Sequence, residues 1–117
     1  MSNYCFVAPI LSGGADKIRI WFRDELNSNA DHDRVMRQVG ISREQVWIQH
    51  TETGDFAIAS WETTDPSQTF RTLTNSNDPW AVKYRNLLTE VHGIDFSKGM
   101  PVSEQVGNWH AMERVRD

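Results

Sequence analysis

The stretch EQVWIQHTETGDFAIASWE, residues 44–62, decides the fold. Its two halves, Glu44–Thr51 and Asp55–Glu62, are rich in β-branched and aromatic residues and predict two strands. The intervening ETG, residues 52–54, fits a type I turn that ends on a glycine in the left-handed region. We therefore expect an antiparallel hairpin. The predicted cross-strand partners are Thr51 with Asp55, Ile48 with Ile58, and Trp47 with Ala59.

This register gives the hairpin two different faces. The first is mostly aliphatic and suits packing beneath helices; it carries Val46, Ile48, His50, Phe56, Ile58 and Ser60. The second combines two indoles with small residues; it carries Trp47, Gln49, Ala57, Ala59 and Trp61. Two exposed tryptophans represent roughly 300 Å² of apolar surface, which is the size of an interface patch. Because most soluble oligomers are two-fold homodimers, we expect a homodimer whose interface contains Trp47, Gln49, Ala59 and Trp61.

Before the hairpin, the chain predicts one strand and two helical segments. Tyr4–Ile10 is short, aromatic and β-branched, as strands are. Ser12 can cap a helix that runs to about Leu26 with apolar residues at helical spacing. Asp31 can cap a second helical segment over His32–Val39, which Gly40 ends.

After the hairpin, two Asp-Pro pairs mark helix starts, at Asp65-Pro66 and at Asp78-Pro79. The second helix carries the clearest apolar stripe in the chain, formed by Trp80, Tyr84, Leu87, Leu88 and Val91. Gly93 ends it. Glu104–His110 is a possible fourth strand.

The element order predicts an α+β protein with the split βαββαβ, ferredoxin-like pattern. Its helices would cover one face of an antiparallel sheet. The length of 117 residues corresponds to one domain, residues 1–117.

Composition excludes several classes of protein. A net charge of −4 argues against a nucleic-acid partner, because phosphate binding needs concentrated Lys and Arg. No apolar run is long enough for a membrane span, and no signal peptide opens the chain. A single cysteine excludes an internal disulfide framework. We therefore expect a soluble, cytoplasmic protein.

Three stretches of the chain resemble a known family. They are VAPILSGGADK (7–17), GISREQVWIQHTETGDFAIASWETTDP (40–66) and VHGIDF (91–96). They are similar to an uncharacterised bacterial family of the dimeric α/β-barrel superfamily, which includes antibiotic-biosynthesis monooxygenases, haem-degrading monooxygenases and stress-responsive barrel proteins. The resemblance implies a homodimer in which two sheets pack into a barrel. It also implies a pocket in each subunit between the sheet and the helices.

A ligand in that pocket would meet Val46, Ile48 and Phe56 on the sheet and Leu88 on the helix. His50, Tyr84 and His92 are the candidate catalytic residues, because they can exchange or orient protons there. For each histidine a structural role is also open: half-burial for His50, and a helix-end dipole interaction for His92. No HExxH or other local metal signature is present, so we expect no metal.

The resemblance also suggests two kinds of oxygenase chemistry. Haem-degrading relatives use an asparagine, a tryptophan and a helical histidine, for which this chain offers Asn3, Trp61 and His92. The spacing differs from theirs, so we do not assign haem, and we expect no cofactor, with haem and flavin left open. Cofactor-independent oxygenation needs only an apolar cavity and a few polar groups.

Two functional hypotheses therefore remain. The first is a protein that binds or oxidises a small apolar or aromatic molecule in a sheet–helix pocket, with a monooxygenase-like activity that needs no cofactor. The second is a non-catalytic homodimeric interaction module, structural or stress-associated. A pocket filled by side chains would favour the second.

Overall fold

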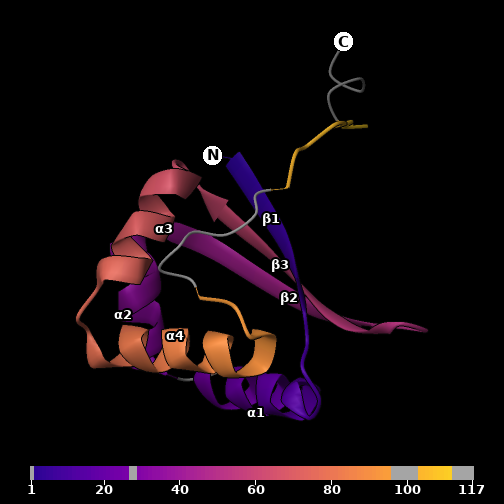
Figure 1. The fold of residues 1–117 in the computed structure, drawn as a ribbon. Helices are drawn as coiled ribbons and strands as arrows, with labels where there is room; N and C mark the ends of the chain where they lie inside the picture. Colours follow the sequence, from indigo (N-terminus) through magenta and orange to yellow (C-terminus); the bar gives the residue numbers. More distant parts are fainter. Residues whose placement is uncertain (1, 27–28, 96–102, 112–117) are drawn as a thin grey trace.

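An antiparallel sheet of three strands, with the order β1-β3-β2, forms one layer of the computed structural model. The structure describes residues 2–26, 29–95 and 103–111. The strands are β1 (Ser2–Pro9), β2 (Ile41–Thr51) and β3 (Gly54–Thr63), and the helices are α1 (Gly14–Leu26), α2 (Ala30–Val39), α3 (Pro66–Asn75) and α4 (Pro79–His92). Figure 1 shows the four helices gathered on one side of the sheet. This α+β arrangement is compatible with a ferredoxin-like fold.

The expected fourth strand is not formed. Glu104–His110 lies within the described residues, and it has no strand geometry. One backbone hydrogen bond ties its start to the sheet, from the Ser103 N–H to the Cys5 carbonyl of β1 at 3.3 Å. Gly107 and Asn108 have low strand propensity, and Val106 and Trp109 are exposed. The segment therefore stays outside the sheet.

The register of the hairpin differs by one residue from the predicted one. Thr51 pairs with Gly54, Trp47 with Ile58, and Ile48 with Ala57. The loop thus has two residues, Glu52 and Thr53. The Thr51 hydroxyl donates to the Gly54 carbonyl at 2.6 Å, and Gly54 has a φ of +138°, which favours glycine.

Side chains alternate between the two faces of a sheet, so a one-residue shift in register changes which residues of the two strands share a face. Ala57, Ala59 and Trp61 therefore lie on the helix-covered face with Val46 and Ile48. Phe56 and Ile58 lie on the other face with Trp47 and Gln49. The predictions that placed Trp61 and Ala59 beside Trp47, and Phe56 beside Val46, are wrong for this reason.

The core is built from aromatic side chains on the covered face and on the helices. Trp61 is 1% exposed and packs against Tyr4, Phe6 and Phe70. A second aromatic group, Trp21, Trp80 and Tyr84, joins α1 to α4 with ring centroids 5.3–5.8 Å apart. The small residues Ala8, Ala57 and Ala59 are buried on the same face of the sheet.

Both Asp-Pro helix starts are confirmed. Asp65 accepts the Gln68 backbone N–H at 3.1 Å, and Asp78 accepts the Trp80 backbone N–H at 2.9 Å. Helix α4 ends at Gly93 in the left-handed region. Helix α2 starts differently from the prediction, because Asn29 rather than Asp31 supplies the capping oxygen.

Candidate functional site

The predicted sheet–helix pocket is almost filled by side chains. Val46, Tyr84 and Leu88 line a small apolar cavity there, as expected, together with His92. Its volume is only about 20 Å³, which holds about one water molecule. Phe6, Ile18 and Phe22 are among its other lining residues. Phe56 takes no part, because it lies on the other face of the sheet.

The remaining predicted residues lie outside this cavity. Ile48 and His50 line an open surface hollow of about 350 Å³ beside α1. The hollow and the cavity share Ile18, Phe22 and Val46 as lining residues. His50 is exposed, and its Nδ1 lies 2.7 Å from the carboxylate of Asp55. A wall of side chains thus separates His50 from Tyr84.

Tyr84 and His92 have clear structural partners. The Tyr84 hydroxyl donates to Glu44 Oε2 at 3.4 Å, and burial, followed by the nearby Glu44 charge, raises the pKa of Tyr84 well above its ordinary value. His92 donates from Nδ1 to the Pro9 carbonyl at 2.8 Å. Burial lowers the pKa of His92, so the neutral ring ties the end of α4 to β1.

Glu44 is the polar centre that the sequence did not reveal. It points from β2 to the covered face, where its side chain is 4% exposed. Its Oε2 accepts the Trp61 indole N–H at 2.8 Å in addition to the Tyr84 hydroxyl. Its Oε1 lies 3.4 Å from Nε2 of His32. A buried carboxylate needs such donors, because removing its charge from water is otherwise unfavourable.

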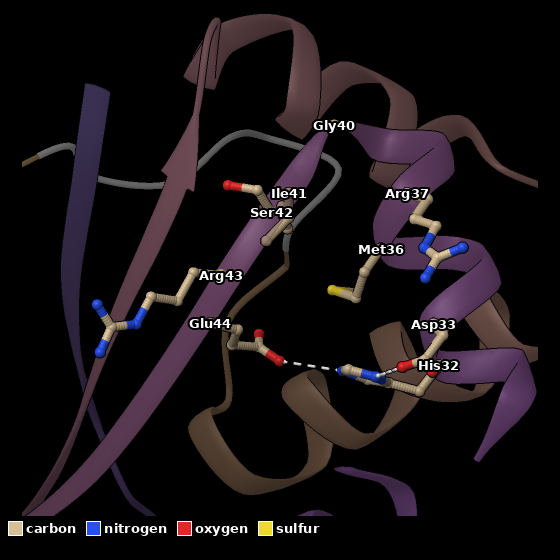
Figure 2. A pocket seen from close by; sticks show the side chains of 9 residues that line it. All are labelled: His32, Asp33, Met36, Arg37, Gly40, Ile41, Ser42, Arg43 and Glu44. Carbon is tan, nitrogen blue, oxygen red and sulfur yellow. Dashed lines mark hydrogen bonds and ion pairs between the residues drawn. The ribbon is translucent and has the colours of Figure 1, made fainter. Parts of the chain in front are cut away.

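His32 lies between two carboxylates. Its Nδ1 is 3.2 Å from Asp33, and its Nε2 faces Glu44. The hydrogen bond to Glu44 is the main reason why the pKa of His32 is raised. Beside this pair opens a hollow of about 600 Å³ between residues 32–37 of α2 and residues 41–44 of β2. Figure 2 shows Met36 pointing into this α2–β2 hollow and the His32–Glu44 contact at one end of it.

One sequence signal could have revealed Glu44. Strand residues two apart share a face, so Glu44 shares a face with Val46 and Ile48. A carboxylate that shares a strand face with two partly buried aliphatic residues is unusual. The pattern would have indicated a buried charge, although not its partners.

The uncovered side of the sheet forms a second candidate site, here called the open face. Its apolar residues are Cys5, Val7, Pro9, Trp47, Phe56 and Ile58. Val7 is 51% exposed and Trp47 49% exposed. Gln49 belongs to this face as expected, whereas Trp61 and Ala59 are buried in the core.

Comparison of the chain with protein-family models, with curated proteins and with solved structures returns no match. Within residues 2–26, 29–95 and 103–111, no group of three or more His, Cys, Asp or Glu side chains could hold a metal ion. The helices in these ranges are also too short or too polar to cross a bilayer.

Proposed function

We propose that the protein is a homodimeric interaction module in which the open faces of two copies pack against each other. The observation that carries this proposal is an apolar sheet face over which no helix of the described residues lies. Trp47 and Val7 are each about half exposed on it, and Phe56 and Ile58 lie between them on the central strand. A contiguous apolar patch on a sheet normally marks an interface, and sheets pack face to face about 10 Å apart.

Charge supports a second copy as the occupant. The chain carries a net charge of −4, so two copies repel each other over most of their surface. The open face is different: its charged residues, Arg43 and Glu62, are of opposite sign and directly opposite each other in the sheet. Two copies can therefore meet on this face without opposing like charges. The dimeric α/β barrel that the sequence resembles is built in the same way, which is support by analogy only.

The test is the mass in solution of two single-charge variants. We expect the unmodified protein to have twice the 13.5 kDa chain mass by light scattering at micromolar concentration. Trp47→Glu should give the monomer mass, because an unpaired charge in a dry interface is strongly unfavourable. Ile20→Glu is the matched control: Ile20 is an equally exposed apolar residue, at 50%, on α1, and this variant should remain a dimer.

Circular dichroism shows whether each variant is folded. A monomeric unmodified protein, or a folded Trp47→Glu variant that remains dimeric, would exclude the open face as the interface. Val7→Glu gives a second, independent probe of the same face on β1.

A second candidate function is the binding or oxidation of a small apolar or aromatic molecule. The apolar cavity and the surface hollow beside α1 favour it, because they are neighbours that share Ile18, Phe22 and Val46 as lining residues. A ligand that displaced the Phe22 ring would have His50 on the side of the hollow and Tyr84 on the side of the cavity. A thermal-shift screen with aromatic phenols, flavin and haem tests this candidate. We expect Phe22→Ala to bind any hit more strongly than the unmodified protein does. If neither protein gives a hit, this candidate is excluded and the interaction module remains as the only proposal.

A further inference from the structure

We propose that His32 is a pH-operated latch that fastens the first turn of α2 to β2 and thereby closes one end of the α2–β2 hollow. This inference concerns the helix-covered side of the sheet and is independent of the proposed dimer. Helix α2 lies beside β2, and the His32 ring bridges them. The His32 side chain is 9% exposed, so the contact is shielded from water.

The geometry suits the doubly protonated ring. Both ring nitrogens face carboxylate oxygens, Nδ1 at Asp33 and Nε2 at Glu44. An imidazolium donates from both nitrogens, whereas a neutral imidazole has one N–H and one lone pair. When the proton is lost, one carboxylate therefore faces a lone pair. Glu44 is the buried partner of the two, so the loss of its contact is the more unfavourable.

In the described part of the chain, no cation other than His32 contacts Glu44. The groups around His32 are Asp33 on its own helix, Glu44 on β2, and the ring of Trp80 on α4, whose centroid is 5.4 Å away. On Glu44, the Trp61 indole and the Tyr84 hydroxyl are neutral donors.

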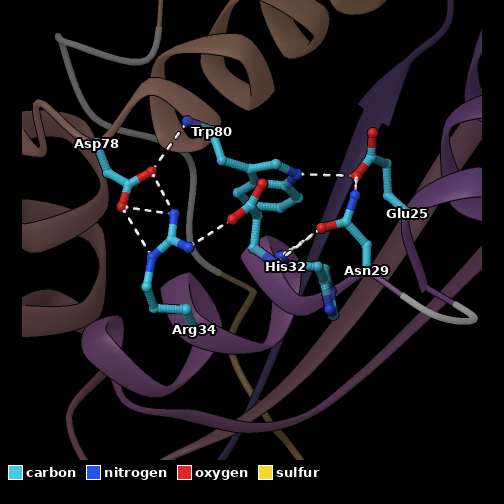
Figure 3. Close-up of polar contacts among 7 residues, drawn as sticks. Glu25, Asn29, His32, Arg34, Asp78 and Trp80 are labelled. Atoms are coloured by element: carbon cyan, nitrogen blue, oxygen red, sulfur yellow. Dashed lines mark hydrogen bonds and ion pairs between the residues drawn. The ribbon is translucent and has the colours of Figure 1, made fainter.

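Two of the cations near the start of α2 are already paired, as Figure 3 shows for Arg34. Arg37 and Arg43 also line the α2–β2 hollow, but no ion pair joins either of them to Glu44 in the described residues. Arg34 binds Asp31 and Asp78, and Lys83 of α4 binds Glu25 of α1. The Glu25 carboxylate also accepts the Trp80 indole N–H at 3.0 Å and the Asn29 amide. The charge on His32 is therefore the only one in this part of the described chain that links α2 to Glu44.

Opening of the latch should stay local. Val35, Met36 and Val39 bury the rest of α2 in the core, and they carry no titratable group. Loss of the His32 proton therefore loosens the first turn, next to the hollow, while the second half of the helix remains packed. The hollow then opens further at the end that His32 and Glu44 line.

Hydrogen–deuterium exchange of the unmodified protein at about pH 6 and about pH 8.5 tests the latch, after correction for intrinsic exchange rates. We expect residues 30–34 to exchange about fivefold faster at the higher pH, with residues 55–61 of β3 unchanged. His32→Gln keeps an N–H donor but cannot titrate, so its exchange should not depend on pH. His50→Gln, which changes an exposed histidine on the hairpin, should retain the dependence.

Equal exchange of residues 30–34 at both pH values would overturn the proposal. So would a pH dependence that persists in His32→Gln. Faster exchange in β3 to the same degree would show that the pH acts on global stability rather than on a latch, and would overturn it as well.

Discussion

Removing the Glu44 carboxylate should be among the most destabilising single changes in this protein. Glu44→Ala leaves the Trp61 indole, the Tyr84 hydroxyl and His32 without their shared acceptor. The bond from Trp61 is short, at 2.8 Å, and bonds to a charged group contribute about 1.5–3 kcal/mol. The other two are long, at 3.4 Å, and contribute less. We therefore expect a loss of about 4 kcal/mol in the free energy of unfolding, within the range for breaking a buried charged pair.

Glu44→Gln removes the charge of the side chain but keeps its shape, so it measures the contribution of the charge alone. The amide oxygen can still accept the Trp61 N–H, so the expected loss is only about 1–2 kcal/mol. Urea denaturation followed by circular dichroism measures both variants. Glu52→Ala is the control, because Glu52 is an exposed glutamate in the hairpin loop, and its loss should stay within about 0.5 kcal/mol of zero. A Glu44→Ala loss no larger than that of Glu52→Ala would refute the buried carboxylate as the organising centre.

Two further outcomes follow from the structure. Asp78→Ala removes both the cap of α4 and the partner of Arg34, and the urea midpoint should fall by the equivalent of about 1 kcal/mol; an unchanged midpoint would contradict the cap. The pKa of His92 is lowered in the folded state, so its contribution to stability is present above its ordinary value near 6.5 and is lost as the pH falls through the folded value. Urea midpoints measured from about pH 7 to about pH 5 should therefore fall less steeply for His92→Gln than for the unmodified protein; identical slopes would rule this out.

The features that the sequence predicted correctly are determined by residues that are adjacent in the chain. Asp65-Pro66 and Asp78-Pro79 combine a capping side chain with a proline that suits the first helical turn, and both mark helix starts in the structure. The hairpin strands were likewise evident from local composition. The fourth strand at residues 104–110 was not formed, because a strand also requires a continuous ladder of partners, which composition does not report.

The register and the site depend on residues far apart in the chain. The ETG sequence is compatible with a loop of two or three residues, and the pairing along the full length of both strands determines which of them forms. With the two-residue loop, Trp61 lies in the core and not in the expected interface. Glu44 meets Trp61 and Tyr84, which lie 17 and 40 residues further along the chain, so no local pattern could have joined them. The volume of the predicted pocket depended in the same way on Phe6, Ile18 and Phe22.

The reactivity of Cys5 tests the central claim, packing of the open face against a second copy, most directly. Cys5 is the single cysteine of the sequence, and it lies partly exposed on the open face, opposite Ser60. The measurement is the rate of its reaction with a fluorogenic maleimide as the protein is diluted. Packing of two open faces predicts a slow reaction at high protein concentration that becomes several-fold faster on dilution, and a fast reaction at every concentration for Trp47→Glu. One rate at all concentrations, shared by both proteins, would contradict the account.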